Sequence, residues 1–218
     1  MKKYIWDNSL SLVFLFLFLI SMAGQYITGH DQYNQELLQE GSSPIPLAEY
    51  ATSGHFIQST FENWESEFLQ MALFVWFTIF LYQRGSSESK KFDGTDAVDR
   101  KPNPKKKDAP GPVKRGGAAL KIYQHSLTLV LLLLFAVSTW LHFRGSLADE
   151  NKILALRGET VKTAWEYMGG SRFWFESFQN WQSEFLSIVA IVVLSIYLRQ
   201  KGSPQSKPVD APYDETGE

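Results

Sequence analysis

The feature that most constrains this chain is an uncharged apolar run near its N-terminus. Residues 9–28 contain no Asp, Glu, Lys, Arg or His and are rich in Leu and Phe. About 20 such residues in an α-helix span the ~30 Å hydrocarbon core of a bilayer. The run therefore predicts a membrane protein.

Three further apolar stretches extend this prediction. Residues 126–143 form a second run of the same kind, whereas residues 68–82 and 185–198 are shorter and continue upstream into aromatic-rich sequence. The net charge of −2 reflects the polar loops between these stretches. We expect four transmembrane helices, at about 9–28, 64–84, 124–144 and 181–201.

An internal repeat organises the chain. The motif F-x-N-W-x-S-E-F-L occurs at residues 61–69 and again at 178–186, an offset of 117 residues (178 minus 61). The same offset, without insertion, pairs positions along the whole repeat: Ser9 with Ser126, Gly41 with Gly158, Tyr50 with Tyr167, and Gln83 with Gln200. Because the offset also holds in the polar loops, we expect the loops to fold as part of each copy.

The repeat predicts an all-α membrane protein with four transmembrane helices in two parallel tandem two-helix repeats. Each copy has an even number of helices, so both copies enter the membrane in the same direction. Repeat 1 covers residues 1–84 and repeat 2 covers residues 122–201. The Pro- and Lys-rich linker 85–121 and the tail 202–218 are expected to be disordered.

The first apolar run also fits a signal peptide. Lys2 and Lys3 precede it, and the segment 21–23, Ser-Met-Ala, resembles a cleavage site. Its counterpart at 126–143 is internal and cannot be a signal peptide. The repeat therefore favours a retained helix.

Basic residues set the expected orientation. Of the 21 Lys and Arg residues, 16 lie in the N-terminus, the linker region and the C-terminus, five lie in the second long loop, and residues 29–66 have none. This bias places both termini and the linker in the cytoplasm. The lysine cluster 105–107 fits contact with anionic lipid, and we expect no nucleic-acid partner.

The duplicated motif carries the candidate polar site. On a helix, Asn63 and Glu67 share one stripe, as do Asn180 and Glu184. A carboxylate inside a membrane is costly unless it faces a cavity, a partner or another helix. The first helix of each copy carries polar residues near the same depth, which complete the candidate set: Ser21 and Gln25 in copy one, Ser138 and His142 in copy two.

Three interpretations of this site remain open. Polar side chains between membrane helices commonly act as hydrogen-bonding glue, and Ser with Glu also caps helices. The carboxylates could instead bind a cation or a proton, or dock a partner. The motif's aromatic residues are expected to anchor the helices at the outer membrane interface: Phe61, Trp64, Phe178 and Trp181.

The loops add local predictions. We expect short helices at 31–39, 46–50 and 164–168. The first loop is acidic and the second mixes both signs, so three uses fit: gathering cations, pairing between the loops, or plain solvated surface. His30 and His55 lack a metal-ligand spacing, and we expect no metal.

Enzymatic chemistry finds no support in the sequence. The chain has no Cys, which excludes thiol nucleophiles and zinc–thiolate sites. It also has no phosphate loop and no nucleophile elbow. We therefore expect a non-enzymatic protein without a cofactor.

The doubled motif, followed by Q-R-G-S at 83–86 and R-Q-K-G-S-P at 199–204, resembles a family of bacterial multi-pass membrane proteins of unknown function. The resemblance covers nearly the whole chain. It implies a bacterial source and a multi-pass location, which we take as the inner membrane, and it carries over no activity.

Two functions follow as hypotheses. The first is a structural or partner-docking protein of the lipid bilayer that acts as a homo-oligomer or with another membrane protein. The alternative is a small ion or proton channel or transporter that uses the Asn and Glu stripe.

Overall fold

The computed structural model of this chain describes residues 2–92, 94 and 96–217. Within these residues the regular structure consists of nine α-helices and one 3-10 helix, with no strand. The all-α prediction is therefore confirmed. Residues 1, 93, 95 and 218, which fall in the predicted repeat 1, linker and tail, lie outside the described residues.

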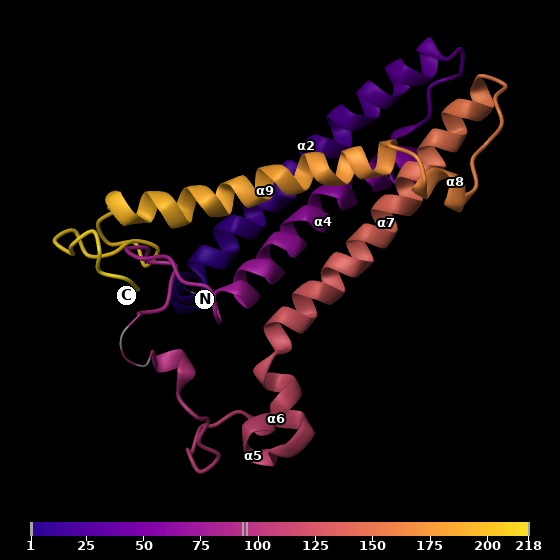
Figure 1. The fold of residues 1–218 in the computed structure, drawn as a ribbon. Helices are drawn as coiled ribbons and strands as arrows, with labels where there is room; N and C mark the ends of the chain where they lie inside the picture. The colour runs from indigo at the N-terminus through magenta and orange to yellow at the C-terminus, as the bar shows by residue number, and fades with distance from the viewer. Residues whose placement is uncertain (1, 93, 95, 218) are drawn as a thin grey trace. The chain divides into compact units, whose positions relative to one another are not determined.

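Four long helices dominate the fold (Figure 1). Three of them, α2 (Ser9–Gln39), α7 (Ser126–Leu156) and α9 (Arg172–Tyr197), are long and apolar enough to cross a membrane. The fourth, α4 (Gly54–Phe77), is not among these candidates, and the polar motif at 61–69 lies in its middle. A fourth membrane span therefore stays a prediction.

The end of α4 differs from the expected boundary at residue 84. Its regular helix ends at Phe77. Beyond it the backbone tightens, because the N–H groups of Ile79 and Phe80 bond three residues back, to the carbonyls of Trp76 and Phe77, at 3.2 and 3.1 Å. Such turns are common where a helix ends. The apolar residues after Phe77 predicted a hydrophobic environment, but they did not determine the backbone conformation.

The other long helices also differ from the predicted bounds. Helix α9 was expected at about 181–201, but it begins earlier, at Arg172, and ends at Tyr197. Both α2 and α7 have 31 residues and continue beyond the expected ends at 28 and 144. The helix expected at 31–39 is thus the last part of α2. Helix α8 (Ala164–Met168) has the predicted bounds, and α3 (Leu47–Tyr50) begins just after Pro46. A short α1 (Lys2–Asp7) precedes α2.

Short helical pieces also occur in the segment predicted as a linker. They are the 3-10 helix η1 (Ala97–Asp99), α5 (Gly111–Arg115) and the beginning of α6 (Gly117–Gln124). Pro112 lies in the first turn of α5, where its missing N–H costs nothing. The rest of the described linker consists of turns and irregular backbone.

The chain divides into two compact units. Unit 1 comprises Met1–Glu62 and Thr139–Trp174, and unit 2 comprises Asn63–Ser138 and Phe175–Glu218. Helices α4, α7 and α9 each contribute residues to both units.

Unit 1 has its own core, built from the loop-proximal part of α2. Tyr33, Leu37 and Tyr50 are fully buried, and three partly buried side chains pack against them: Tyr26, Ile45 and Phe56. The aromatic rings of Tyr50 and Phe56 lie 5.3 Å apart. The loop after α2 is therefore folded against this helix.

The same loop contact occurs twice in the chain. The Asn34 side chain accepts from the N–H of Ile45 at 2.8 Å and donates to its carbonyl at 3.1 Å. Asn151 makes the same two bonds with Lys162, at 2.7 and 2.9 Å. Each Asn and each partner lies 117 residues from its counterpart.

Unit 2 contains two matching turns after the long helices. The N–H of Gln83 bonds the hydroxyl of Ser89 at 3.0 Å, and the N–H of Gln200 bonds Ser206 at 2.9 Å. The tail also packs, in contrast to the disorder we predicted. Lys207 is 2% exposed, since carbonyls of Pro212, Tyr213 and Glu215 accept from its ammonium group.

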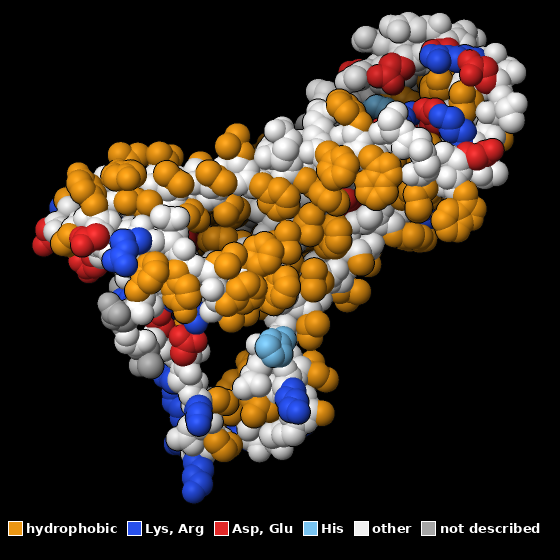
Figure 2. Space-filling model, viewed as in Figure 1, with side chains coloured by type: hydrophobic (Ala, Val, Ile, Leu, Met, Phe, Trp, Pro, Cys, Tyr) orange, Lys and Arg blue, Asp and Glu red, His pale blue; other side chains and the backbone are white. Residues whose placement is uncertain are grey.

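The long helices present apolar surfaces. Hydrophobic side chains cover much of them in the space-filling view, whereas charged side chains gather at the loops (Figure 2). None of the most apolar 18 residues of α2 is buried within the chain. A surface of this kind needs lipid or protein against it.

Candidate functional site

The strongest candidate site is a pair of carboxyl groups in unit 2. Glu67 lies on α4 and Glu184 on α9, and their carboxyl groups lie close enough to interact. Two ionised carboxylates in such proximity repel each other, so a proton on one of the two groups relieves the repulsion. The pair therefore forms a site for one proton.

A second contact supports the carboxyl pair. The Gln70 amide on α4 donates to the Ser187 hydroxyl at 2.9 Å and to the carbonyl of Glu184 at 3.4 Å. Gln70 and Ser187 are 117 residues apart, as are Glu67 and Glu184. In unit 2, α4 and α9 thus meet through equivalent residues of the two motif copies.

The asparagines of the predicted stripe are arranged differently. The Asn180 amide donates to the carbonyl of Glu176 in its own helix, at 3.0 Å. Asn63 is exposed. The structure therefore brings together the two glutamates of the stripe, with Gln70 and Ser187 beside them, as the core of the site.

One of the predicted interfacial anchors has a partner inside unit 2. The indole N–H of Trp181 donates to the Glu65 carboxylate at 3.0 Å, and the ring lies 5.5 Å from that of Phe178. Glu65 is fully buried, yet sequence reasoning missed it. It occupies a variable position of the motif, where the second copy has Gln182, so comparison of shared residues passed over it.

The predicted residues on the first helices take other partners. Gln25 donates to the hydroxyls of Ser59 and Thr60, both at 3.3 Å, whereas Ser21 is exposed. Ser138, in unit 2, is 2% exposed. Gln25 thus links α2 to α4, which for this residue fits the interpretation as hydrogen-bonding glue.

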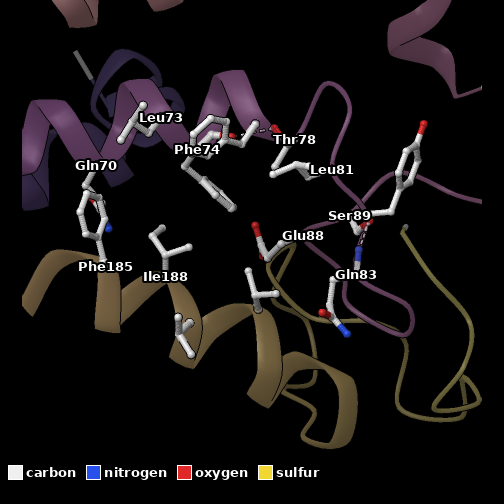
Figure 3. A pocket seen from close by; sticks show the side chains of 14 residues that line it. Gln70, Leu73, Phe74, Thr78, Leu81, Gln83, Glu88, Ser89, Phe185 and Ile188 are labelled. Carbon is white, nitrogen blue, oxygen red and sulfur yellow. Dashed lines mark hydrogen bonds between the residues drawn. The ribbon is translucent and has the colours of Figure 1, made fainter. Parts of the chain in front are cut away.

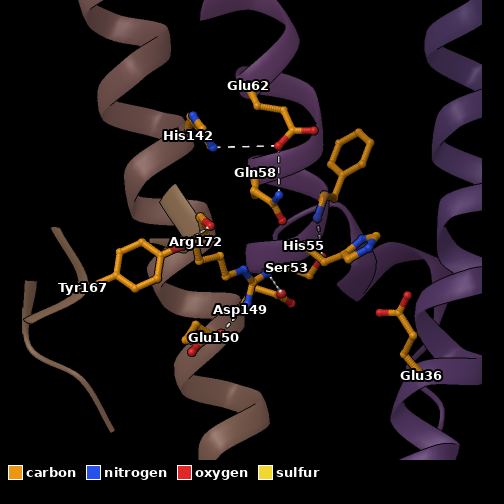
Figure 4. Close-up of polar contacts among 12 residues, drawn as sticks. Glu36, Ser53, His55, Gln58, Glu62, His142, Asp149, Glu150, Tyr167 and Arg172 are labelled. Carbon is orange, nitrogen blue, oxygen red and sulfur yellow. Dashed lines mark hydrogen bonds and ion pairs between the residues drawn. The ribbon is translucent and has the colours of Figure 1, made fainter. Parts of the chain in front are cut away.

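His142 belongs to a polar group in unit 1 (Figure 4). It is fully buried, and its Nε2 lies 3.8 Å from the Glu62 carboxylate. The Gln58 amide donates to the same carboxylate at 2.9 Å. A buried imidazole needs such partners, because an unsatisfied polar group in the interior costs about 1–3 kcal/mol.

Charged residues of unit 1 form a second group near the loops. The Arg172 guanidinium donates to Asp149 at 2.8 Å and to Glu150 at 2.6 Å (Figure 4). Lys162 also donates to Glu150, at 2.7 Å. Asp149 is nearly buried, so a counter-ion beside it is required. No spacing along the chain singled out these residues beforehand.

One ion pair joins the two long loops. Arg157 donates to both oxygens of the Glu40 carboxylate, at 2.5 and 2.9 Å. Hydrogen bonding from Arg157 holds the pKa of Glu40 below its ordinary value. Pairing between the loops, one of the uses we considered, is thus observed at this position.

Tyr50 is a fully buried tyrosine in the core of unit 1. Burial raises the pKa of Tyr50 to about 12, and the nearby Glu36 and Asp149 add to the effect. The hydroxyl shares a 3.0 Å hydrogen bond with Nδ1 of His55. Tyr50 therefore stays neutral at physiological pH and serves the packing of the loop.

Comparison with known protein families matches the whole chain, residues 1–218, to a family described as a domain of unknown function (DUF6766). The chain belongs to this family. No curated protein matched it, and neither did a solved structure. The expected resemblance to an uncharacterised family is confirmed, while the bacterial source stays a prediction.

Proposed function

We propose that this chain is a small proton-conducting protein of the bacterial inner membrane and that the Glu67–Glu184 pair is its proton-binding site. The observation that carries the proposal is the close approach of the two carboxyl groups, which occupy the same position in the two copies of the motif. The pair can hold one proton or release it, and acidic residues inside membrane helices characteristically mark proton pathways.

The proposal includes four membrane spans with both termini in the cytoplasm. Glu40 and Arg157 are in contact within unit 1, so their loops share one side of the bilayer. The chain between them must then cross the bilayer an even number of times. Helix α7 supplies one crossing, and α4 is the other long helix between them in the described residues. Its 24 residues measure about 36 Å at ~1.5 Å per residue, enough for the ~30 Å core.

Proton flux into liposomes tests the carboxyl pair. The purified chain is reconstituted with a pH-sensitive dye inside the vesicles, and an imposed pH gradient drives the flux. We expect the double variant Glu67→Gln, Glu184→Gln to reduce the flux to the rate of empty liposomes, because an amide does not exchange protons as a carboxyl group does.

The control variant is Glu159→Gln, which removes an exposed acid from the second outer loop. It should conduct like the unchanged chain. Conduction by the double variant at the original rate, or no flux above empty liposomes with the folded unchanged chain, would contradict the proposal.

Partner docking is the second candidate function. Its support is the apolar stretch of α2 that the chain leaves uncovered. Docking between copies also complements the first proposal. A close-packed helix bundle fills its own centre, so a proton path would form between copies of the chain. We expect a homo-oligomer.

The mass of the protein in nanodiscs tests docking. A single chain per particle across a range of protein concentrations would exclude a stable homo-oligomer. A second protein recovered in fixed ratio after gentle extraction would instead indicate a partner in another chain.

A further inference from the structure

An apolar pocket of about 520 Å³ lies between α4 and α9 in unit 2 (Figure 3). Its volume is within the range of small-ligand sites, about 300–1,000 Å³. Side chains from both helices build the wall, among them Leu73, Phe74, Phe77, Phe185, Ile188 and Val192.

The polar groups of this pocket lie toward its two ends, apart from Thr78, whose hydroxyl donates to the Phe74 carbonyl of its own helix at 2.9 Å. Gln70 is at one end, where its amide is already bonded to Ser187. Gln83, Glu88 and Ser89 are at the other end, where the chain turns after α4 (Figure 3). An occupant must therefore be apolar along its length and polar only at the end near Glu88.

A second pocket, of about 880 Å³, continues from this polar end. The two pockets share Phe74, Thr78, Glu88 and Ser89. The second is lined by charges of both signs, among them Lys90, Lys91, Asp96, Asp99 and His125. Lys90 pairs with Asp99 at 2.9 Å.

We propose that the two pockets together bind one zwitterionic phospholipid. One acyl chain occupies the apolar pocket between α4 and α9, and the headgroup lies in the charged pocket. Its ammonium group faces the Glu88 carboxylate, and its phosphate faces Lys91 and His125. The membrane location is that of the proposed function; the two sites meet at Gln70, but neither Glu67 nor Glu184 lines either pocket.

The charges select this lipid class over other amphiphiles. A fatty acid would place its carboxylate beside Glu88 and Asp96, where like charges repel. A purely anionic headgroup would meet three carboxylates and two ammonium groups. A headgroup that carries both signs complements the mixed lining better.

Native mass spectrometry of the full chain tests the proposal. The delipidated protein in detergent is mixed with phosphatidylethanolamine or with phosphatidylglycerol. We expect one phosphatidylethanolamine per chain to remain bound, at a level at least threefold above phosphatidylglycerol. Ile188→Trp fills the apolar pocket and should reduce retention at least tenfold.

Two further variants complete the test. Leu194→Trp adds the same side chain at a half-exposed position on α9 outside the pocket and should retain lipid normally. Glu88→Gln leaves the apolar wall intact, so it should keep a bound lipid but lose the preference for the amine headgroup. Leu73→Phe replaces Ile188→Trp if that variant does not fold.

Equal retention by Ile188→Trp and Leu194→Trp would overturn the acyl-chain site, as would the absence of bound lipid from the unchanged protein. A mass of two chains without lipid, lost in Ile188→Trp, would assign the pocket to a second copy and overturn the proposal. Equal binding of the two lipids would overturn the zwitterionic headgroup. Proton flux by protein that binds no lipid would show that the lipid site has failed while the proposed function stands.

Discussion

At the scale of single residues, the cap of α8 makes the stability of this short helix depend on pH. Thr163 donates its backbone N–H to the Glu166 carboxylate at 2.7 Å and its hydroxyl at 2.8 Å. These bonds, the backbone one first, lower the pKa of Glu166. Because the folded-state pKa is lowered, the stabilisation is present above the ordinary value of about 4.3 and is lost as the pH falls through the folded-state pKa.

We predict that Thr163→Val raises the pKa of Glu166 and frays α8, because the hydroxyl is both a cap and a donor to the carboxylate. An NMR titration of the Glu166 side chain in micelles measures the shift. Thr163→Ser keeps the hydroxyl and should titrate like the unchanged chain. Identical titrations for the Val and Ser variants would contradict the role of the hydroxyl.

The buried His142 leads to a second residue-scale prediction. Its counterpart in the other copy is Gln25, so His142→Gln replaces one hydrogen-bonding group with another that the repeat already uses. His142→Leu instead leaves Glu62 with fewer polar neighbours. We expect the Leu variant to lose about 1–3 kcal/mol of unfolding free energy and the Gln variant less than half of that.

Chemical unfolding in mild detergent, followed by tryptophan fluorescence, compares these two variants. Equal losses would mean that the shape of the imidazole, and not its polar contact, stabilises the site.

At the scale of helices, a glycine contact brings α4 and α7 close together in unit 1. A Cβ on Gly145 would lie 2.5 Å from the backbone nitrogen of Gln58 and 2.9 Å from the carbonyl oxygen of Gly54. Both atoms belong to the backbone, so a neighbouring side chain cannot move aside to make room. Small residues commonly permit this close packing between membrane helices.

Gly145→Ala should therefore push the helices apart and cost about 1–3 kcal/mol, as overpacking typically does. Gly24→Ala is the matched control in α2, because a Cβ there would meet nothing within 4 Å. We expect it to be neutral or slightly stabilising, since Ala favours a helix over Gly by about 1 kcal/mol. Thermal unfolding in detergent ranks the two, and equal midpoints would contradict the close contact.

The helices also show which features the sequence could predict. The apolar runs and the repeat located α2, α7 and α9, and the segment 164–168 coincides with α8. The end of α4 was missed because Ile79, Phe80 and Leu81 continue the apolar pattern, while backbone turns stop the regular helix at Phe77. Hydrophobicity predicts the environment of a residue better than its backbone hydrogen bonds.

The candidate site was predictable in the same partial sense. Helical spacing and duplication pointed to Glu67 and Glu184, because both lie on the polar stripe of an otherwise apolar segment. Their contact with each other depends on how α4 and α9 pack, which no single-helix projection contains. Arg172 and Asp149 were missed for the same reason: they lie 23 residues apart, and only the fold makes them partners.

At the scale of the whole molecule, three and four spans predict different topologies. If α4 did not cross the membrane, Ser43 and the linker residue Lys106 would share one side. With four spans they lie on opposite sides, and Glu159 joins Ser43 on the outside. The contact between Glu40 and Arg157 favours the second arrangement, because it requires an even number of crossings between the two loops.

The absence of cysteine makes this arrangement easy to test. Single substitutions Ser43→Cys, Lys106→Cys, Glu159→Cys and Gln205→Cys introduce one thiol each at an exposed position. A membrane-impermeant maleimide added to intact cells should label positions 43 and 159. Positions 106 and 205 should react only after permeabilisation, since the positive-inside bias places the linker and the tail in the cytoplasm. Labelling of positions 43 and 106 from the same side would show that α4 does not span the membrane, and it would remove the topological basis for placing Glu67 and Glu184 inside the bilayer.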